Sequence, residues 1–108
     1  MFTPRYQNEQ TDLLIRSLLA LENAEETYRF LEDVLTIQEL KSVTQRLEVA
    51  VMLRNKETYQ EIVRKTGAST TTIGRVNRTL QYGAYGYAMV LDRLAEKAQQ
   101  KEQEVHNE

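Results

Sequence analysis

Residues 58–80 read TYQEIVRKTGASTTTIGRVNRTL and predict two short helices joined by a tight turn. Thr58 and Glu61 have the T-x-x-E spacing of a capping box, in which each side chain accepts a hydrogen bond from the other's backbone amide. Gly67 falls where the turn requires positive φ without a Cβ clash. Ser69 is placed to cap the second helix. The segment is therefore expected to be a helix-turn-helix at residues 58–81.

The two helices are expected to bury one side and expose the other. The apolar residues expected on the buried side are Ile62, Val63, Ile73, Val76 and Leu80. At about 100° per residue, the opposite side of the second helix brings together Thr71, Arg75 and Arg78, with Gly74 and Thr79 beside them. Arginine can bind guanine or a phosphate, threonine can reach a phosphate or a thymine methyl, and glycine lets the backbone approach closely. This surface favours DNA binding, although any amphipathic hairpin with a glycine turn shares the pattern.

Positive charge is concentrated in the same hairpin. The whole chain has a net charge of −2, but residues 58–83 carry four basic side chains against one acidic side chain, a net of +3. Residues 1–57 have a net charge of −3 and residues 84–108 a net charge of −2. Phosphate affinity depends on the local field rather than on the total charge, so this basic island supports nucleic-acid binding.

The composition argues against several other functions. Cysteine is absent, which removes thiol chemistry and disulfides and fits a reducing cytoplasm, where we expect the protein. The single histidine, His106, lies in a polar C-terminal segment, and we expect no metal site. Without a phosphate loop, paired catalytic carboxylates or a Ser/His/Asp set, we expect no enzyme and no catalytic residues. Apolar runs fall far short of the about 18 residues that cross a bilayer, so no membrane partner is expected.

Helical signals extend along almost the whole chain and predict an all-α fold of about six helices. Apolar spacing and cap signals place helices at 9–22, 23–34, 36–54, 58–66, 69–82 and from 84 onward. Gly83 is expected to end the helix that precedes it. We expect a single domain at residues 1–95 and a polar, frayed tail at residues 96–108.

The first expected helix is apolar on more than one side. Its large aliphatic residues are Leu13, Leu14, Ile15, Leu18, Leu19 and Leu21. So wide a stripe in a short chain indicates burial against a partner as well as against its own domain. A two-fold dimer would also present two recognition helices one DNA turn apart, about 34 Å. We therefore expect a homodimer, and a monomer with a thicker core is the alternative.

A resemblance to the bacterial Trp repressor superfamily, and within it to the YerC/YecD branch, is carried by two segments. They are FLEDVLTIQELKSVTQRLEVAVML at 30–53 and TYQEIVRKTGASTTTIGRVNRTLQYG at 58–83. The similarity covers roughly residues 10–95, and GASTTTIGRVNRTL is its most specific part. It implies an all-helical, intertwined homodimer, interlocked through the N-terminal and C-terminal helices, with one helix-turn-helix head per chain.

The same resemblance raises the question of an effector, because the member that names the family is switched by tryptophan. Matching positions imply ligand contacts at Thr36, Arg46, Arg75 and Thr79. Val76, however, stands where the tryptophan-binding protein has glycine, and its branched side chain would fill space that an indole needs. We therefore expect no cofactor, and a small-molecule co-repressor other than tryptophan or no effector at all.

Together these features predict a sequence-specific, DNA-binding transcriptional regulator, expected to be a repressor, that places its second hairpin helix in the major groove as a dimer. The residues expected to contact double-stranded DNA are Thr58, Tyr59, Gln60, Ser69, Thr70, Thr71, Thr72, Arg75 and Arg78. The alternative is a helical adaptor that docks a protein partner without specific DNA binding.

Overall fold

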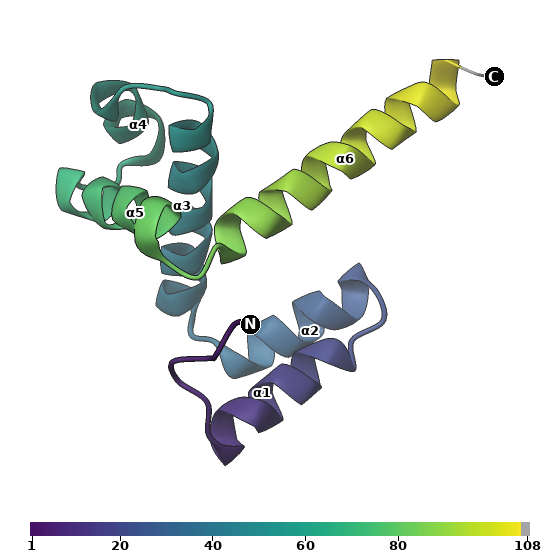
Figure 1. Ribbon diagram of the computed structural model, residues 1–108. Coiled ribbons are helices and arrows are strands. Elements are labelled where there is room, and N and C mark those ends of the chain that lie inside the picture. The colour runs from purple at the N-terminus through teal and green to yellow at the C-terminus, as the bar shows by residue number, and fades with distance from the viewer. Residues whose placement is uncertain (107–108) are drawn as a thin grey trace. The chain divides into compact units, whose positions relative to one another are not determined.

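The chain is all α-helical in the computed structural model, which describes residues 1–106 (Figure 1). Its helices are α1 (Glu9–Leu19), α2 (Ala24–Val34), α3 (Ile37–Arg54), α4 (Tyr59–Thr66), α5 (Thr70–Tyr82) and α6 (Gly86–His106). The predicted all-α class with about six helices is confirmed for these residues. None of these helices has the length and apolar character that a membrane span requires.

Two compact units make up the chain, the first at residues 1–40 and the second from Lys41 onward. In the first unit, α1 and α2 run in opposite directions (Figure 1). Asn8 Oδ1 accepts a hydrogen bond from the Thr11 amide at 2.8 Å, and Asn23 Oδ1 accepts one from the Glu26 amide at 2.9 Å, so an asparagine caps each helix. No residue within α1 or α2 is buried. Their exposed large apolar side chains are Leu13, Leu14, Ile15, Leu18, Leu19, Tyr28 and Val34.

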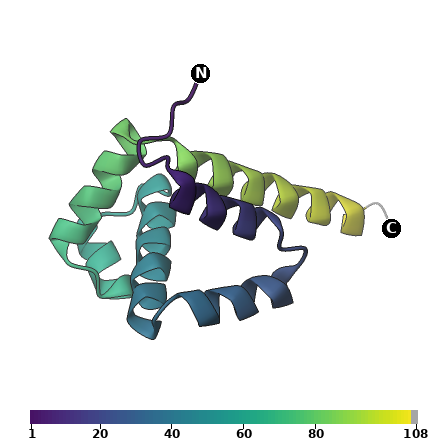
Figure 2. The same ribbon diagram turned by 90° about the horizontal axis from the view of Figure 1, so that it is seen from below.

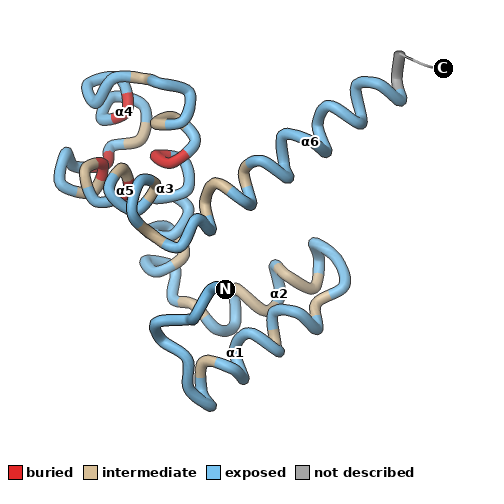
Figure 3. The backbone as a smooth tube through the Cα atoms, viewed as in Figure 1, coloured by how far each residue is buried: buried red, intermediate tan, exposed pale blue. Residues whose placement is uncertain are grey.

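The buried core of the described chain lies in the second unit, on α3, α4, α5 and the turn before α5 (Figure 3). It consists of Val49, Ala50, Ile62, Ala68, Ile73 and Val76. Leu80 of α5 and Leu91 of α6 are partly buried and pack against it. The predicted inward positions are thus confirmed for Ile62, Ile73, Val76 and Leu80. Val63 was expected there too, but it is 37% exposed, because the adjacent Ile62 occupies the inward side of this two-turn helix.

The last helix, α6, is continuous through His106 (Figures 1 and 2). Arg54 of α3 pairs with Asp92 near the start of α6 and donates a hydrogen bond to the Ala88 carbonyl at 3.4 Å. The helix therefore includes most of the segment 96–108 that we expected to fray, and residues 107–108 lie outside the described part. Glu, Lys, Gln and Ala dominate this segment, and all four are strong helix formers with no glycine or proline among them. The division into a domain at 1–95 and a tail stays a prediction.

The connection between α3 and α4 ends α3 with two hydrogen bonds of a Schellman motif. The Lys56 amide donates to the Leu53 carbonyl at 3.0 Å, and the Glu57 amide donates to the Met52 carbonyl at 3.1 Å. This motif requires a left-handed residue, and Lys56 takes that conformation with φ of 62°. The motif places Thr58 directly at the start of α4.

Candidate nucleic-acid interface

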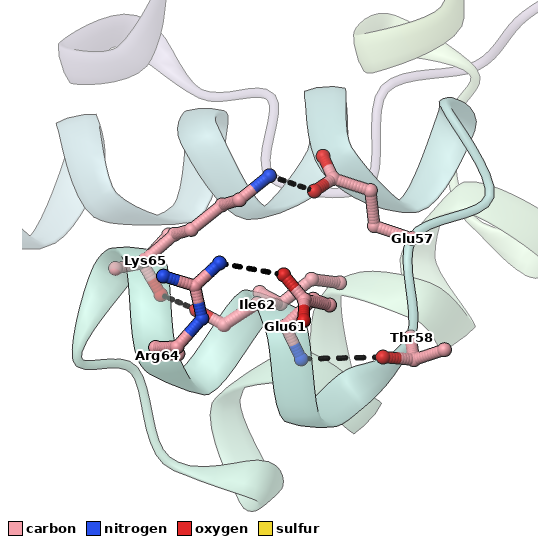
Figure 4. Close-up of polar contacts among 7 residues, drawn as sticks. Glu57, Thr58, Glu61, Ile62, Arg64 and Lys65 are labelled. Carbon is pink, nitrogen blue, oxygen red and sulfur yellow. Dashed lines mark hydrogen bonds and ion pairs between the residues drawn. The ribbon is translucent and has the colours of Figure 1, made fainter.

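The start of α4 shows half of the predicted capping box. Thr58 is the N-cap, and its hydroxyl oxygen accepts a hydrogen bond from the Glu61 amide at 3.2 Å. The Glu61 carboxylate does not reach back to Thr58 as predicted from the T-x-x-E spacing. It pairs with Arg64 one turn further along, at 2.7 Å (Figure 4). The Arg64 guanidinium group carries a full positive charge and competes with the Thr58 amide for the carboxylate, which therefore turns away from the cap.

A second ion pair joins the end of α4 to the residue segment that precedes it. Lys65, near the end of α4, contacts Glu57, which precedes the helix by two residues (Figure 4). Both basic residues of α4 therefore have a carboxylate partner. The hydrogen bond and the charge of Arg64 lower the pKa of Glu61, and Glu61 in turn raises the pKa of Arg64. The Arg64–Glu61 pair is exposed and the Lys65–Glu57 pair is partly exposed, so both add little to stability, but they leave only two of the four basic side chains of the hairpin without a carboxylate partner in the described chain.

The turn between α4 and α5 is built around Gly67 and Thr66. Gly67 has φ of 72° and its amide donates to the Val63 carbonyl at 2.9 Å, which confirms the predicted left-handed turn. Thr66 Oγ1 donates to the Ile62 carbonyl at 2.7 Å and accepts from the Ala68 amide at 3.1 Å. Gln45 of α3 donates to the Thr66 carbonyl at 3.3 Å. The turn is thus anchored to α3, which sets the direction in which α5 begins.

The start of α5 is capped by Ser69, as predicted. Its hydroxyl oxygen accepts a hydrogen bond from the Thr72 amide, and its O–H donates one to the Thr72 hydroxyl oxygen, each at 3.1 Å. Thr72 is half-buried and its hydroxyl takes part in this cap, whereas Thr70 and Thr71 are exposed. Of the three α5 threonines expected to contact DNA, two therefore present their side chains to solvent.

The outward surface of α5 is formed by Thr70 at the start of the helix and by Thr71, Arg75 and Arg78, which lie opposite the buried Ile73 and Val76. All four of its residues are exposed. No ion pair within the described residues involves Arg75 or Arg78. The two arginines stand one turn apart at the i and i+3 positions of a helix, so their guanidinium groups can serve the same ligand. This surface can donate hydrogen bonds to an extended anion such as a nucleic-acid backbone.

The remaining predicted contacts lie at the start of α4. Thr58, Tyr59 and Gln60 are all exposed, and Tyr59 is 39% exposed. They stand in the first turn of α4, whereas Ser69 and Thr70 stand at the start of α5. The first turns of both helices thus present side-chain hydroxyls to solvent.

Known proteins with this sequence pattern share the architecture. The family model for the Trp repressor protein matches residues 9–95. The chain belongs to the Trp repressor family. It is 50% identical over 92 residues to YerC, an uncharacterised protein of Bacillus subtilis, and the match covers 85% of this chain and 88% of YerC.

Two solved structures extend this similarity to three dimensions. A TrpR-like protein from Eubacterium eligens has a TM-score of 0.80 and 49% identity, covering 82% of this chain and 92% of that one. A candidate Trp repressor from Staphylococcus aureus has a TM-score of 0.79 and 45% identity, covering 82% of this chain and 89% of that one. Membership of the Trp repressor family, one of transcription regulators, suggests a DNA-binding helix-turn-helix regulator and not an enzyme.

Structural roles account for two of the positions that the Trp repressor resemblance relates to tryptophan, Thr36 and Val76. Val76 is 3% exposed and its side chain belongs to the core, next to Ile73 on the same helix. Thr36 caps α3, accepting from the Glu39 amide at 3.1 Å while its own amide donates to Glu39 at 2.9 Å. Arg46 and Thr79 are exposed, like Arg75. The cap explains Thr36 without a ligand, and Val76 fills the position that would have to be small.

One contact of this interface is absent from the sequence-based prediction, and one predicted residue gains weight. Glu57 and Lys65 are eight residues apart, and Glu57 precedes the helix. The i, i+3 and i, i+4 spacings that predict side-chain contacts on a helix do not include this pair. Gly74 was placed beside the predicted contacts as a residue that lets the backbone approach DNA closely, and it lies on α5 between Thr70 and Arg78. A glycine in the middle of a helix is an unfavourable choice, and that alone is a signal of a special role.

Proposed function

We propose that this member of the Trp repressor family is a sequence-specific transcriptional regulator, acting as a repressor, that binds duplex DNA through the major groove. One observation carries the proposal: the outward surface of α5 has two exposed arginines without ion-pair partners in the described chain, directly opposite the buried core. The core holds the helix in place, so its arginines and threonines are positioned before the ligand arrives. A helix in the major groove uses such side chains for guanine and phosphate contacts.

The proposed contacts divide by role. Arg75, Arg78 and Thr71 face the bases or the nearest phosphates from the middle of α5. Thr70 and Ser69 lie at the start of α5, where free backbone amides also attract phosphate. The first turn of α4, with Thr58, Tyr59 and Gln60, contacts the DNA backbone and sets the register. Thr72 contributes through the cap that it forms with Ser69.

We further propose that the protein binds DNA as a homodimer. The support is the exposed apolar side of α1, on which Leu13 is 58% exposed and Leu19 is 79% exposed. A second copy of the chain would cover such a surface and would place two α5 helices on one DNA molecule. In a monomer, Leu19→Glu should change the free energy of unfolding by no more than about 0.5 kcal/mol. In the proposed dimer it should shift the sedimentation equilibrium towards the monomer and lower the melting temperature.

Tryptophan is not the proposed effector. Since Val76 is in the core, an indole could enter only by displacing it. Titration calorimetry should show no micromolar binding of free tryptophan, and tryptophan should leave the affinity for DNA unchanged. A micromolar dissociation constant would contradict the interpretation of Val76. A different small molecule remains open as a co-repressor.

The central test is selection of bound sequences from random duplex DNA. We expect wild-type protein to enrich a palindromic motif whose half-sites lie about 10 bp, one helical turn, or a multiple apart. The double variant Arg75→Ala/Arg78→Ala is the control, and it should fold normally and enrich no motif. If folded wild-type protein enriches nothing, the proposal fails and the adaptor function becomes the better explanation of the hairpin.

A further inference from the structure

Gly74 stands in the middle of α5 although the fold does not require a glycine there. Its φ is not positive; among the glycines of the described chain, Gly67 is the one with a positive φ. A Cβ built on Gly74 would meet no atom within 4 Å outside its own helix backbone and adjacent residues. Glycine is among the least favourable residues in a helix interior, and alanine is the most favourable. An alanine at position 74 would therefore fit the fold and stabilise it.

The other glycines of the second unit show what a structural requirement looks like. Gly67 has φ of 72°, a conformation that residues with a Cβ adopt only with strain. A Cβ on Gly83 would lie 2.5 Å from the Thr79 carbonyl oxygen, so the backbone excludes a side chain. Gly86 has open space, but it is the first residue of α6, where a glycine has little effect on the helix. Gly74 alone among these four combines a helix-interior position with free space.

The residues around Gly74 indicate which kind of ligand could approach the helix there. Gly74 lies one turn after Thr70 and Thr71 and one turn before Arg78, within the outward surface of α5. Gly74 itself is half-buried, and the open space where its Cβ would lie has threonine hydroxyl groups one turn before it and a guanidinium group one turn after it. These flanking groups are donors for anionic oxygen and for base edges, which duplex DNA presents at regular spacing.

We propose that Gly74 is the point of closest approach between α5 and duplex DNA. The backbone of the helix comes into van der Waals contact with a group in the major groove at this residue, and Thr71 and Arg78 bind on either side of it. The side chain is absent because a methyl group would hold the helix away from the groove and lengthen the flanking hydrogen bonds. This inference rests on the proposed DNA-binding function and adds a residue that determines docking depth.

The competing explanation is that Gly74 makes α5 flexible. The two explanations order the same substitutions differently. If flexibility matters, Gly74→Ala should bind DNA worst, because alanine stiffens a helix more than serine or valine does. If close approach matters, binding should weaken with side-chain size, from alanine through serine to valine.

The experiment measures melting temperature and DNA affinity for the same variants. The probe is the duplex that wild-type protein selects from random DNA, and Gly86→Ala is the control that adds one methyl group to a different helix. We expect Gly74→Ala to raise the melting temperature by about 4–8 °C. We expect it to weaken DNA binding by about tenfold or more, with serine and valine progressively worse and Gly86→Ala unchanged.

The outcomes separate this inference from the function on which it rests. Unchanged DNA affinity in Gly74→Ala would overturn the inference and leave DNA binding intact. A lowered melting temperature would also overturn it, because the glycine would then serve the fold. An order in which alanine binds worst would overturn it in favour of flexibility. Wild-type protein that selects no duplex would overturn the proposed function itself, and the inference with it.

Discussion

The salt dependence of DNA binding should distinguish the two pairs of basic residues in the hairpin. The first variant is Arg75→Ala/Arg78→Ala, and the second is Arg64→Ala/Lys65→Ala. Both remove two positive charges per chain, so an effect of net charge alone would be equal in the two. They differ in their surroundings, because Arg64 and Lys65 are paired with Glu61 and Glu57, whereas no ion pair of the described residues involves Arg75 or Arg78.

The expected magnitude follows from counting phosphate contacts. Each cation that neutralises a phosphate adds about 0.9 to the slope of log K against log salt concentration. If Arg75 and Arg78 each contact one phosphate in both heads of a dimer, four contacts are lost and the slope falls by about 3.6. The α4 cations already have carboxylate partners, so fewer counterions leave when DNA binds. Their removal should lower the slope by less than half of that, under about 1.8.

The assay is fluorescence anisotropy with the selected duplex at salt concentrations from about 50 to 200 mM, where a slope difference of 3.6 changes affinity about a hundredfold. Thermal melting of both variants is the control, and it should change little because all four side chains are exposed. Equal loss of slope in the two variants would refute the role assigned to the ion pairs. Loss of affinity without loss of slope in Arg75→Ala/Arg78→Ala would refute the phosphate contacts and indicate base contacts.

Three further predictions concern stability. Gly83→Ala should destabilise the protein by about 1–3 kcal/mol in urea unfolding, because its Cβ would lie 2.5 Å from the Thr79 carbonyl oxygen and 2.9 Å from Thr79 Cγ2, and unchanged stability would contradict this. Lys56→Gly should stabilise by about 0.5–1 kcal/mol, since the left-handed strain relieved exceeds the added chain entropy, and a loss of stability would show that the lysine side chain matters more. The hydrogen bond from the Thr36 amide holds the pKa of Glu39 below its ordinary value of 4.5. Wild-type protein should therefore be more stable than Glu39→Gln above about pH 4.5, and this difference in stability should shrink as the pH falls through the lowered pKa. A difference between these two proteins that does not vary with pH would contradict the assignment.

The hairpin could be predicted from sequence because its determinants are local. A cap, a glycine with positive φ and an apolar stripe lie within a few residues of the elements they define, so Thr58, Gly67 and Ser69 could each be assigned from short spacings. The buried side of α5 followed from helical periodicity in the same way, and Ile73 and Val76 are indeed in the core. Periodicity also assigned the six helices in their correct order.

The parts that could not be predicted depend on competition between partners. Glu61 had two partners within reach, the amide of Thr58 and the guanidinium group of Arg64, and sequence spacing does not state which bond is stronger. Glu57 and Lys65 meet only because the chain turns just before α4, which is a tertiary feature. The charge sum of +3 already includes Glu61, the partner of Arg64, but not Glu57, which lies just outside the segment and pairs with Lys65, so it overstates the positive charge available to a ligand by one. The positive charge that a segment offers to a ligand can therefore be counted from sequence only when its ion pairs are known.

The distribution of burial indicates that the helix-turn-helix and the apolar surface of α1 have different thermodynamic roles. Every buried residue in the described part of the core lies between Val49 and Val76, so the helix-turn-helix is stabilised by contacts within one chain. α1 has no buried residue and exposes Leu13 and Leu19, so its apolar surface gains stability only when something covers it. If a second copy covers it, subunit concentration should control the melting of α1 and the spacing of the two heads, while the geometry of each α5 stays the same. DNA affinity would then depend on protein concentration through the dimer equilibrium, whereas base preference, which the outward surface of α5 determines, would not.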